Sequence, residues 1–191
     1  MSIITAPISL VFPVRTLHGD SSLADDWLTV RASVMDLLRV VEAAAPNGRD
    51  YYPQGPDAFR IAVEERAAIS ACLSALAEQL YAVAERLIDG FESGDTAKLD
   101  AAFSAFEAVP TTAVVRPTIH INGTSRDSLK ASCVAVFRQA LETEEVFRAI
   151  VPNGRDYQPD QMQAARAQHQ ARVDFVRKVG GYFVKLASTK A

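Results

Sequence analysis

The sequence contains few of the residues that build covalent or metal-held frameworks. It has two cysteines, one tryptophan and three histidines in 191 residues. Cys72 and Cys133 stand alone in apolar runs and belong to no cluster with the spacing of metal ligands. Two isolated cysteines make no disulfide framework, and they give no sign of a zinc site. We therefore expect two buried free thiols in a reducing compartment.

The sequence also lacks an excess of positive charge and any long apolar run. The net charge is -3, so there is no basic domain or stripe of the kind that binds nucleic acid. No stretch approaches the ~20 apolar residues of a membrane span. The residues that follow Met1 lack the basic and apolar regions of a secretory leader. These absences predict a cytoplasmic protein with neither nucleic acid nor membrane among its partners.

Known catalytic motifs are absent as well. The chain has no glycine-rich phosphate loop, no Gly-x-Ser-x-Gly turn and no His-Glu-x-x-His helix. We therefore predict that the protein is not an enzyme and holds neither a cofactor nor a metal. His169 falls on the apolar stripe of a predicted helix, and we expect it to be a hydrogen-bonded, partly buried core residue.

The strongest positive feature is an internal repeat, which is the first pattern to seek in a new sequence. Residues 46–54 read Pro-Asn-Gly-Arg-Asp-Tyr-Tyr-Pro-Gln, and residues 152–160 read Pro-Asn-Gly-Arg-Asp-Tyr-Gln-Pro-Asp. We call 46–51 the first PNGRDY loop and 152–157 the second PNGRDY loop. Two arginines further along also match in this register, because Arg60 and Arg66 correspond to Arg166 and Arg172. The chain is thus a tandem duplication.

Three parts follow from the repeat: a first helix-loop-helix repeat over 1–92, a linker with a short helix over 93–112, and a second repeat over 113–191. Each repeat starts with a segment of extended type, at 8–17 and 113–121, where β-branched residues are frequent. We predict that these two segments pair as a small antiparallel ribbon.

In each repeat a helix precedes the loop and a longer helix follows it. Apolar residues recur every three or four positions in all four helices, as in one-sided amphipathic helices. Ser22 with Asp25, and Thr124 with Asp127, resemble capping boxes at the two helix starts. The apolar stripe of the last helix is interrupted by Gly180 and Gly181.

These elements predict a mainly α fold. A lone helical hairpin has an apolar face with nothing to cover it, and two hairpins from one chain can bury those faces on each other. We expect a pseudo-two-fold four-helix core with short extended segments, which a homodimer could extend.

The second repeat resembles a family of small proteins from tailed bacteriophages and prophages. The resemblance lies in His-Ile-Asn-Gly-Thr-Ser at 120–125, a helix, and the second PNGRDY loop, followed by a charged amphipathic helix. The first repeat is less similar, because His-Gly-Asp-Ser stands at 18–21. The resemblance implies a viral protein, present here as a fused pair, in the cytoplasm of an infected bacterium.

The repeated loops are candidates for a binding site. A plain turn requires proline, asparagine or glycine, but it does not require arginine, aspartate and tyrosine to stay identical in two halves of one chain. Arginine suits phosphate, tyrosine offers a flat face to a base, and aspartate accepts from a ribose hydroxyl or an amine. The predicted ligand-binding residues are Asn47, Arg49, Asp50, Tyr51, Asn153, Arg155, Asp156 and Tyr157.

This set suits a small, anionic, nucleotide-like ligand. Because no catalytic group accompanies it, we hypothesise that the protein sequesters a signalling nucleotide of a bacterial immune system. Two alternatives stay open. The loops could act only as helix caps in a structural protein, or the protein could be an interaction module in which Phe91, Phe103 and Phe106 offer a patch to a partner.

Overall fold

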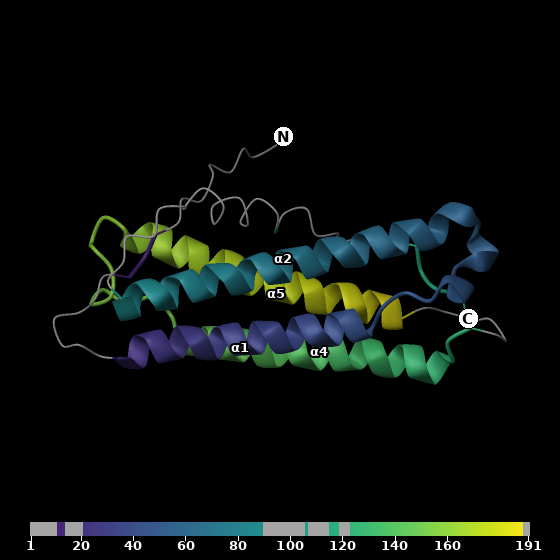
Figure 1. Ribbon diagram of the computed structural model, residues 1–191, viewed down its shortest axis with the longest axis horizontal. Helices are drawn as coiled ribbons and strands as arrows, with labels where there is room; N and C mark the ends of the chain where they lie inside the picture. The colour runs from purple at the N-terminus through teal and green to yellow at the C-terminus, as the bar shows by residue number, and fades with distance from the viewer. Residues whose placement is uncertain (1–10, 14–20, 90–105, 107–114, 119–122, 189–191) are drawn as a thin grey trace.

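The computed structural model describes residues 11–13, 21–89, 106, 115–118 and 123–188, and four long helices make up most of them (Figure 1). Helices α1 (Ser21–Ala43) and α2 (Pro56–Asp89) belong to the first repeat. Helices α4 (Arg126–Ala149) and α5 (Met162–Ala187) belong to the second. The predicted mainly helical fold with a four-helix core is confirmed.

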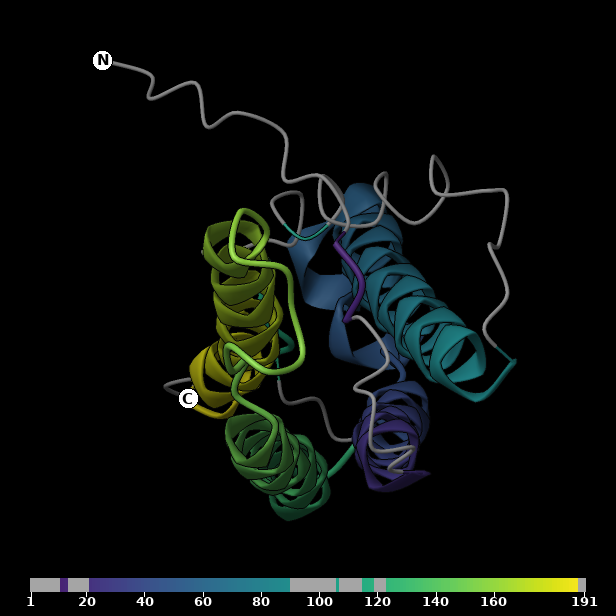
Figure 2. The same ribbon diagram turned by 90° about the vertical axis from the view of Figure 1, so that its left-hand side faces the viewer.

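The helices form two hairpins, and the first helix of one hairpin packs on the first helix of the other. Helix α1 packs on α2, α4 packs on α5, and α1 packs on α4. Figure 1 shows α1 and α4 side by side with opposite chain directions, and Figure 2 shows the four helices end-on. The two PNGRDY loops therefore lie at opposite ends of the bundle (Figure 1).

The two repeats bury matching positions in the core. Helix α4 buries Cys133, Val136, Ala140, Thr143, Glu144 and Phe147. The residues 106 positions earlier, which are Trp27, Val30, Val34, Leu37, Leu38 and Val41, are also buried. At the α1–α4 contact, the Ser33 hydroxyl donates to Thr143 Oγ1 at 2.9 Å. The shared pattern of burial is what makes one hairpin a suitable cover for the other.

Helix ends differ in part from the sequence prediction. The Ser125 side chain, rather than that of Thr124, caps α4 by accepting from the Ser128 N–H at 3.1 Å. Helix α1 includes Ser21, one residue before the predicted cap Ser22. At the start of α2, Gly55 has φ of 101° and Pro56 is the first helical residue. Glycine tolerates this positive φ, and proline suits a first turn that needs no N–H.

Helix α5 continues through Gly180 and Gly181 without a break. Gly180 lies where α5 approaches α4, because a Cβ added to it would be 3.1 Å from Ala140 Cβ and 3.4 Å from Phe137 Cδ2. A Cβ added to Gly181 would meet nothing within 4 Å. The interruption in the apolar stripe is thus a close approach of two helices, at Gly180 alone.

This contrast predicts opposite effects at adjacent glycines. We expect Gly180→Val to lower the free energy of unfolding by about 1–3 kcal/mol, because α4 and α5 must separate to hold the added methyl groups. We expect Gly181→Ala to raise it by about 0.5–1 kcal/mol, because alanine favours the helix more than glycine does. Urea denaturation followed by circular dichroism measures both, and equal effects at the two positions would contradict this account.

Several expectations concern the remaining segments. The described parts of the extended segments, 11–13 and 115–118, contain no strand. The rest of 8–17 and 113–121 lies outside the described residues, so the ribbon stays a prediction. Most of the linker, with Phe91 and Phe103, also lies outside them. Phe106 is buried and stacks on the Phe175 ring at 4.5 Å. It therefore belongs to the core, and the prediction that it offers an exposed patch is wrong.

Helix α2 is the most apolar of the four helices by its length and composition. Residues Pro56–Ile88 would suffice to cross a membrane on those criteria, with a mean hydropathy of 1.4 in their most apolar window. Half of that window is buried inside the bundle, however, and the core helix of a bundle meets the same criteria. The two cysteines, Cys72 and Cys133, are buried and form no disulfide, as predicted.

Candidate functional site

Both PNGRDY loops use their asparagine in the same way. Asn47 Oδ1 accepts from the Arg49 N–H at 3.1 Å, and Asn153 Oδ1 accepts from the Arg155 N–H at 2.9 Å. This side-chain turn replaces a helical hydrogen bond at the point where proline has ended the preceding helix. The repeated asparagine is thus accounted for by local backbone geometry.

Asp50 connects the two repeats. Its side chain is only 3% exposed, and its Oδ1 accepts from the Thr124 N–H at 2.7 Å. Its carbonyl oxygen accepts from the Thr118 N–H, also at 2.7 Å. Gln54, which follows the loop, donates to the carbonyl of Arg116 and to Thr118 Oγ1. The first PNGRDY loop is therefore fixed against the start of the second repeat.

Asp156, the counterpart of Asp50, is placed differently. It is half-buried and accepts from the side-chain amide of Asn153 in its own loop. Partial burial raises the pKa of Asp156, while Arg155 and the Asn153 amide oppose the increase. The segment that would correspond to Arg116–Thr124 in the first repeat lies largely outside the described residues. Asp50 thus bonds to the other repeat, whereas Asp156 bonds within its own loop.

The side chains of Tyr51 and Arg66 form a buried pair next to Asp50. Burial raises the pKa of Tyr51 to about 12, and the Arg66 guanidinium opposes that increase. Arg66 is 8% exposed, and its Nε and Nη1 atoms have no hydrogen-bond partner among the described residues. Its guanidinium carbon lies 4.1 Å from the centroid of the Phe183 ring and 5.7 Å from that of Tyr182. Burial lowers the pKa of Arg66, as expected for a cation removed from water.

A cavity of about 270 Å³ opens at this pair, and we call it the Arg66 cavity. It is lined by Ala43, Ala44, Ala45, Pro46, Asn47, Asp50, Tyr51, Arg66, Pro117, Thr124, Leu129, Ser132 and Leu186. Both repeats contribute to the lining, because it joins the first loop to the ends of α4 and α5. The charged residues of the lining are one guanidinium, Arg66, and one carboxylate, Asp50.

The other end of the bundle holds the corresponding tyrosine and arginine. Tyr157 is buried, and burial raises its pKa to about 12. Arg172 is 2% exposed, and its guanidinium carbon lies 5.3 Å from the centroid of the Trp27 ring. Burial lowers the pKa of Arg172 to about 10. The duplication has thus retained a buried tyrosine and arginine beside each loop.

The predicted site residues fall into two groups. Asn47, Asp50 and Tyr51 line the Arg66 cavity, whereas Arg49 is exposed and does not line it. The four predicted residues of the second loop lie at the opposite end of the bundle (Figure 1). The role of Arg49 in anion binding stays a prediction, and the structure adds Arg66, which the sequence analysis did not single out as a site residue. The signal for Arg66 was present, because it matches Arg172 in the repeat and falls three residues before the buried Ile69.

Next to Arg172 lies the buried His169. Its ring packs edge-on against Phe147, with centroids 6.4 Å apart. Its Nδ1 has no hydrogen-bond partner among the described residues, so the expectation of a hydrogen-bonded histidine is wrong for this atom. Burial, together with the positive charge of Arg172, lowers the pKa of His169.

This shift predicts a loss of stability in mild acid. Above about pH 6.5, the usual histidine pKa, His169 is neutral in both the folded and the unfolded chain. As the pH falls below that value, the unfolded chain takes up a proton that the folded chain resists, so the free energy of unfolding decreases. We expect His169→Leu to lose less stability between pH 7 and pH 5 than the parent does, in urea denaturation at each pH. Equal slopes in the two proteins would rule out this role for His169.

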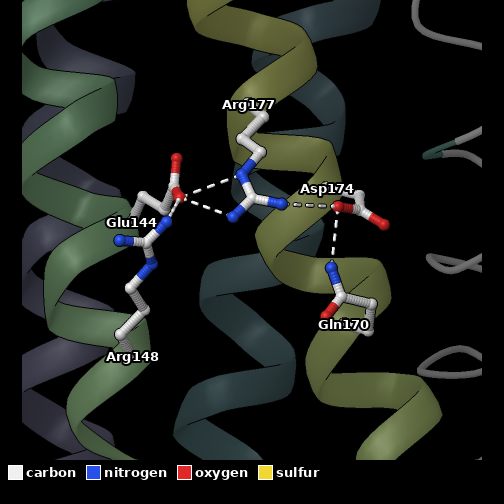
Figure 3. A network of polar contacts seen from close by, with 5 residues as sticks. All are labelled: Glu144, Arg148, Gln170, Asp174 and Arg177. Carbon is white, nitrogen blue, oxygen red and sulfur yellow. Dashed lines mark hydrogen bonds and ion pairs between the residues drawn. The ribbon is translucent and has the colours of Figure 1, made fainter.

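A separate polar network joins α4 to α5 (Figure 3). Glu144 accepts from Arg148 at 2.6 Å and from Arg177 Nε at 2.9 Å. Arg177 also pairs with Asp174, which accepts from the Gln170 amide at 2.9 Å. The hydrogen bond from Arg177 lowers the pKa of Glu144. Because the charges in this network already pair with one another, it is a weaker candidate for ligand binding than the Arg66 cavity.

The described residues contain no group of three or more histidine, cysteine, aspartate and glutamate side chains that could hold a metal ion. His18 and His120 lie outside the described residues. No family model, no curated protein and no solved structure matches the chain. The geometry of the Arg66 cavity is therefore the basis for inferring a function.

Proposed function

We propose that the protein binds a small anionic ligand in the Arg66 cavity, with the Arg66 guanidinium as the group that recognises the anion. The observation that carries this proposal is a buried guanidinium whose Nε and Nη1 have no hydrogen-bond partner among the described residues. Burial of an ion costs several kcal/mol after relaxation. A desolvated cation–π contact, such as that with Phe183, returns about 2 kcal/mol. A bound anion would supply the missing compensation.

The size and the charges of the cavity limit the ligand. A volume of about 270 Å³ is just below the usual range of ~300–1,000 Å³ for ligand pockets, which favours a compact molecule over a long one. Asp50 adds an acceptor to the same lining, since a carboxyl group has two oxygens and can accept further hydrogen bonds besides the one from the Thr124 N–H. A ligand with both an anionic group and a hydrogen-bond donor, such as a nucleotide with its phosphate and its hydroxyls or amine, matches Arg66 and Asp50 together.

The biological role we propose is sequestration. A protein that only holds its ligand needs affinity and no chemistry, and rigid walls that exist before binding favour affinity. With the phage-like pattern at 120–125, this supports a protein of phage origin that captures a signalling nucleotide of a bacterial immune system.

A thermal-shift experiment tests the proposal. The purified protein would be mixed with inorganic phosphate, mononucleotides, cyclic nucleotides and cyclic ADP-ribose isomers, and its melting temperature measured. A ligand at one hundred times its dissociation constant stabilises the folded state by about 2.7 kcal/mol. We expect at least one of these compounds to raise the melting temperature, and we expect Arg66→Gln to abolish the increase.

Arg60→Gln is the matched control for this experiment. Arg60 is also repeated, as Arg166, but its side chain is 58% exposed and already pairs with Asp57 and Glu64. We expect it to leave the ligand-induced shift unchanged. If no compound shifts the melting temperature, or if Arg66→Gln responds like the parent, the proposed site would be disproved.

A structural role for the loops is the second candidate. It is favoured by the two asparagine turns, which account for Asn47 and Asn153 without any ligand. It is also favoured by the hydrogen bond from the Thr124 N–H to Asp50, which holds the two repeats together. A negative ligand screen would leave this as the better account of the loops.

A further inference from the structure

The ring of Tyr51 lies on the face of α2 that carries Arg66. Tyr51 forms a small apolar cluster with Ala58 and Ala62. Ala58, Ala62 and Arg66 are spaced four residues apart, so they follow one another on a single face of the helix. Tyr51 and Arg66 also line the same cavity. The Tyr51 side chain therefore covers the turns of α2 that precede Arg66, and both side chains reach the same space.

Two tyrosines lie near Arg66, and their hydroxyls are placed differently. The Tyr182 hydroxyl donates to Glu65 Oε2 at 3.2 Å, and Tyr182 does not line the Arg66 cavity. Tyr51 does line it, and its hydroxyl makes no hydrogen bond with any residue in the part of the chain that the structure describes. Because burial raises the pKa of Tyr51 to about 12, this hydroxyl keeps its proton at neutral pH. It is thus a hydrogen-bond donor that a ligand in the cavity can use.

We infer that the Tyr51 hydroxyl donates to the same anion that Arg66 binds, and that this anion is an oxyanion of the phosphate type. The Arg66 Nε and Nη1 atoms and the Tyr51 hydroxyl belong to separate side chains. A phosphate group has several oxygens that point in different directions, so it can accept from both side chains at once. This inference rests on the proposed function of the Arg66 cavity. It adds to that function a second anion-binding residue and the chemical class of the anion.

Titrations of inorganic phosphate and of iodide test this inference, followed through the NMR chemical shifts of the backbone amides. Tyr51→Phe removes the hydroxyl and keeps the ring. We expect it to weaken phosphate binding about tenfold, as for the loss of one hydrogen bond to a charged group. We expect its iodide affinity to stay close to that of the parent, because a single-atom anion can bind to the unchanged guanidinium alone. We expect Arg66→Gln to lose both anions.

Tyr52→Phe is the matched control, because Tyr52 is the next residue in the chain and is 84% exposed. We expect it to bind both anions as the parent does. A measurement on the parent replaces the variant if Tyr51→Phe does not fold. In protein with carbon-labelled tyrosine, we expect phosphate to shift the resonance of the phenol carbon of Tyr51 and to leave that of Tyr52 in place.

Three results would overturn the inference and leave the proposed function standing. The first is an equal loss of phosphate and iodide affinity in Tyr51→Phe, which would show that Tyr51 only shapes the cavity. The second is unchanged phosphate binding in Tyr51→Phe, and the third is a parent protein that does not bind inorganic phosphate. Phosphate binding that persists unchanged in Arg66→Gln would instead disprove the proposed site, and the inference with it.

Discussion

Arg66→Met is expected to make the ligand-free protein more stable while it removes ligand binding. Replacement of a buried charged group by an apolar side chain of similar volume is often neutral, or stabilising by about 1–4 kcal/mol, because the desolvation cost disappears. Arg66 meets the conditions for this effect, since it is 8% exposed and two of its nitrogens have no hydrogen-bond partner among the described residues. We expect a gain of about 1–3 kcal/mol in the free energy of unfolding, measured by urea denaturation without ligand.

Arg60→Met provides the control for stability. Its ion pairs with Asp57 and Glu64 lie at the surface, so we expect a change within about 0.5 kcal/mol. The Arg66 result also separates the two candidate functions. A loss of more than about 2 kcal/mol, as expected for disruption of a buried group that the fold needs, would show that Arg66 is structural. A gain would show that the chain keeps a destabilising residue, which is typical of a site that serves function at the expense of stability.

The second large effect is expected at Trp27. Truncation of a fully buried aromatic side chain costs about 3–5 kcal/mol, since it removes apolar contacts and leaves a cavity. Trp27 is 3% exposed and lies in the main core beside Arg172. We expect Trp27→Ala to lower the free energy of unfolding by that amount. Circular dichroism must follow the unfolding, because the variant lacks the single tryptophan of the chain.

A double-mutant cycle with Arg172→Met isolates the contact between the ring and the guanidinium. We expect an interaction energy of about 1–2 kcal/mol, in the range of a desolvated cation–π pair. Leu28→Ala on the same helix is the control, because Leu28 is only partly buried, and we expect it to cost less than Trp27→Ala. Strictly additive effects of the Trp27 and Arg172 substitutions would mean that the contact between the two side chains contributes nothing to the free energy of unfolding.

Local sequence signals predicted the helices and the loops because their causes are local. Proline cannot continue a helix that precedes it, asparagine closes a turn with the N–H two residues on, and the apolar spacing of α1 marks its buried face. The failures at the helix ends are also local, and they are small. Ser125, one residue after the predicted Thr124, caps α4. Both residues have a hydroxyl that can accept from a helix N–H, so the sequence alone did not distinguish them.

The choice of Arg66 over the loop arginines as the proposed anion-binding residue depends on long-range contacts. The sequence treated Arg49 and Arg155 as the anion-binding residues, but both are exposed. Arg60 and Arg66 are both repeated, as Arg166 and Arg172, so the repeat alone did not show which of the two is buried. The distinction arises because Arg66 faces Phe183, which is more than 100 residues away in the chain.

The sequence by itself determined that the chain is a duplication of one helical hairpin, with its loops and its two matched arginines in each copy. Periodicity, turn residues and internal similarity are properties of neighbouring or aligned residues, so they can be read without coordinates. Only the tertiary structure decided that the loops lie at opposite ends, that Asp50 binds the start of the other repeat, and that a cavity opens at Arg66. These features depend on how one repeat packs against the other, and packing is set by the shapes of side chains that the sequence keeps far apart.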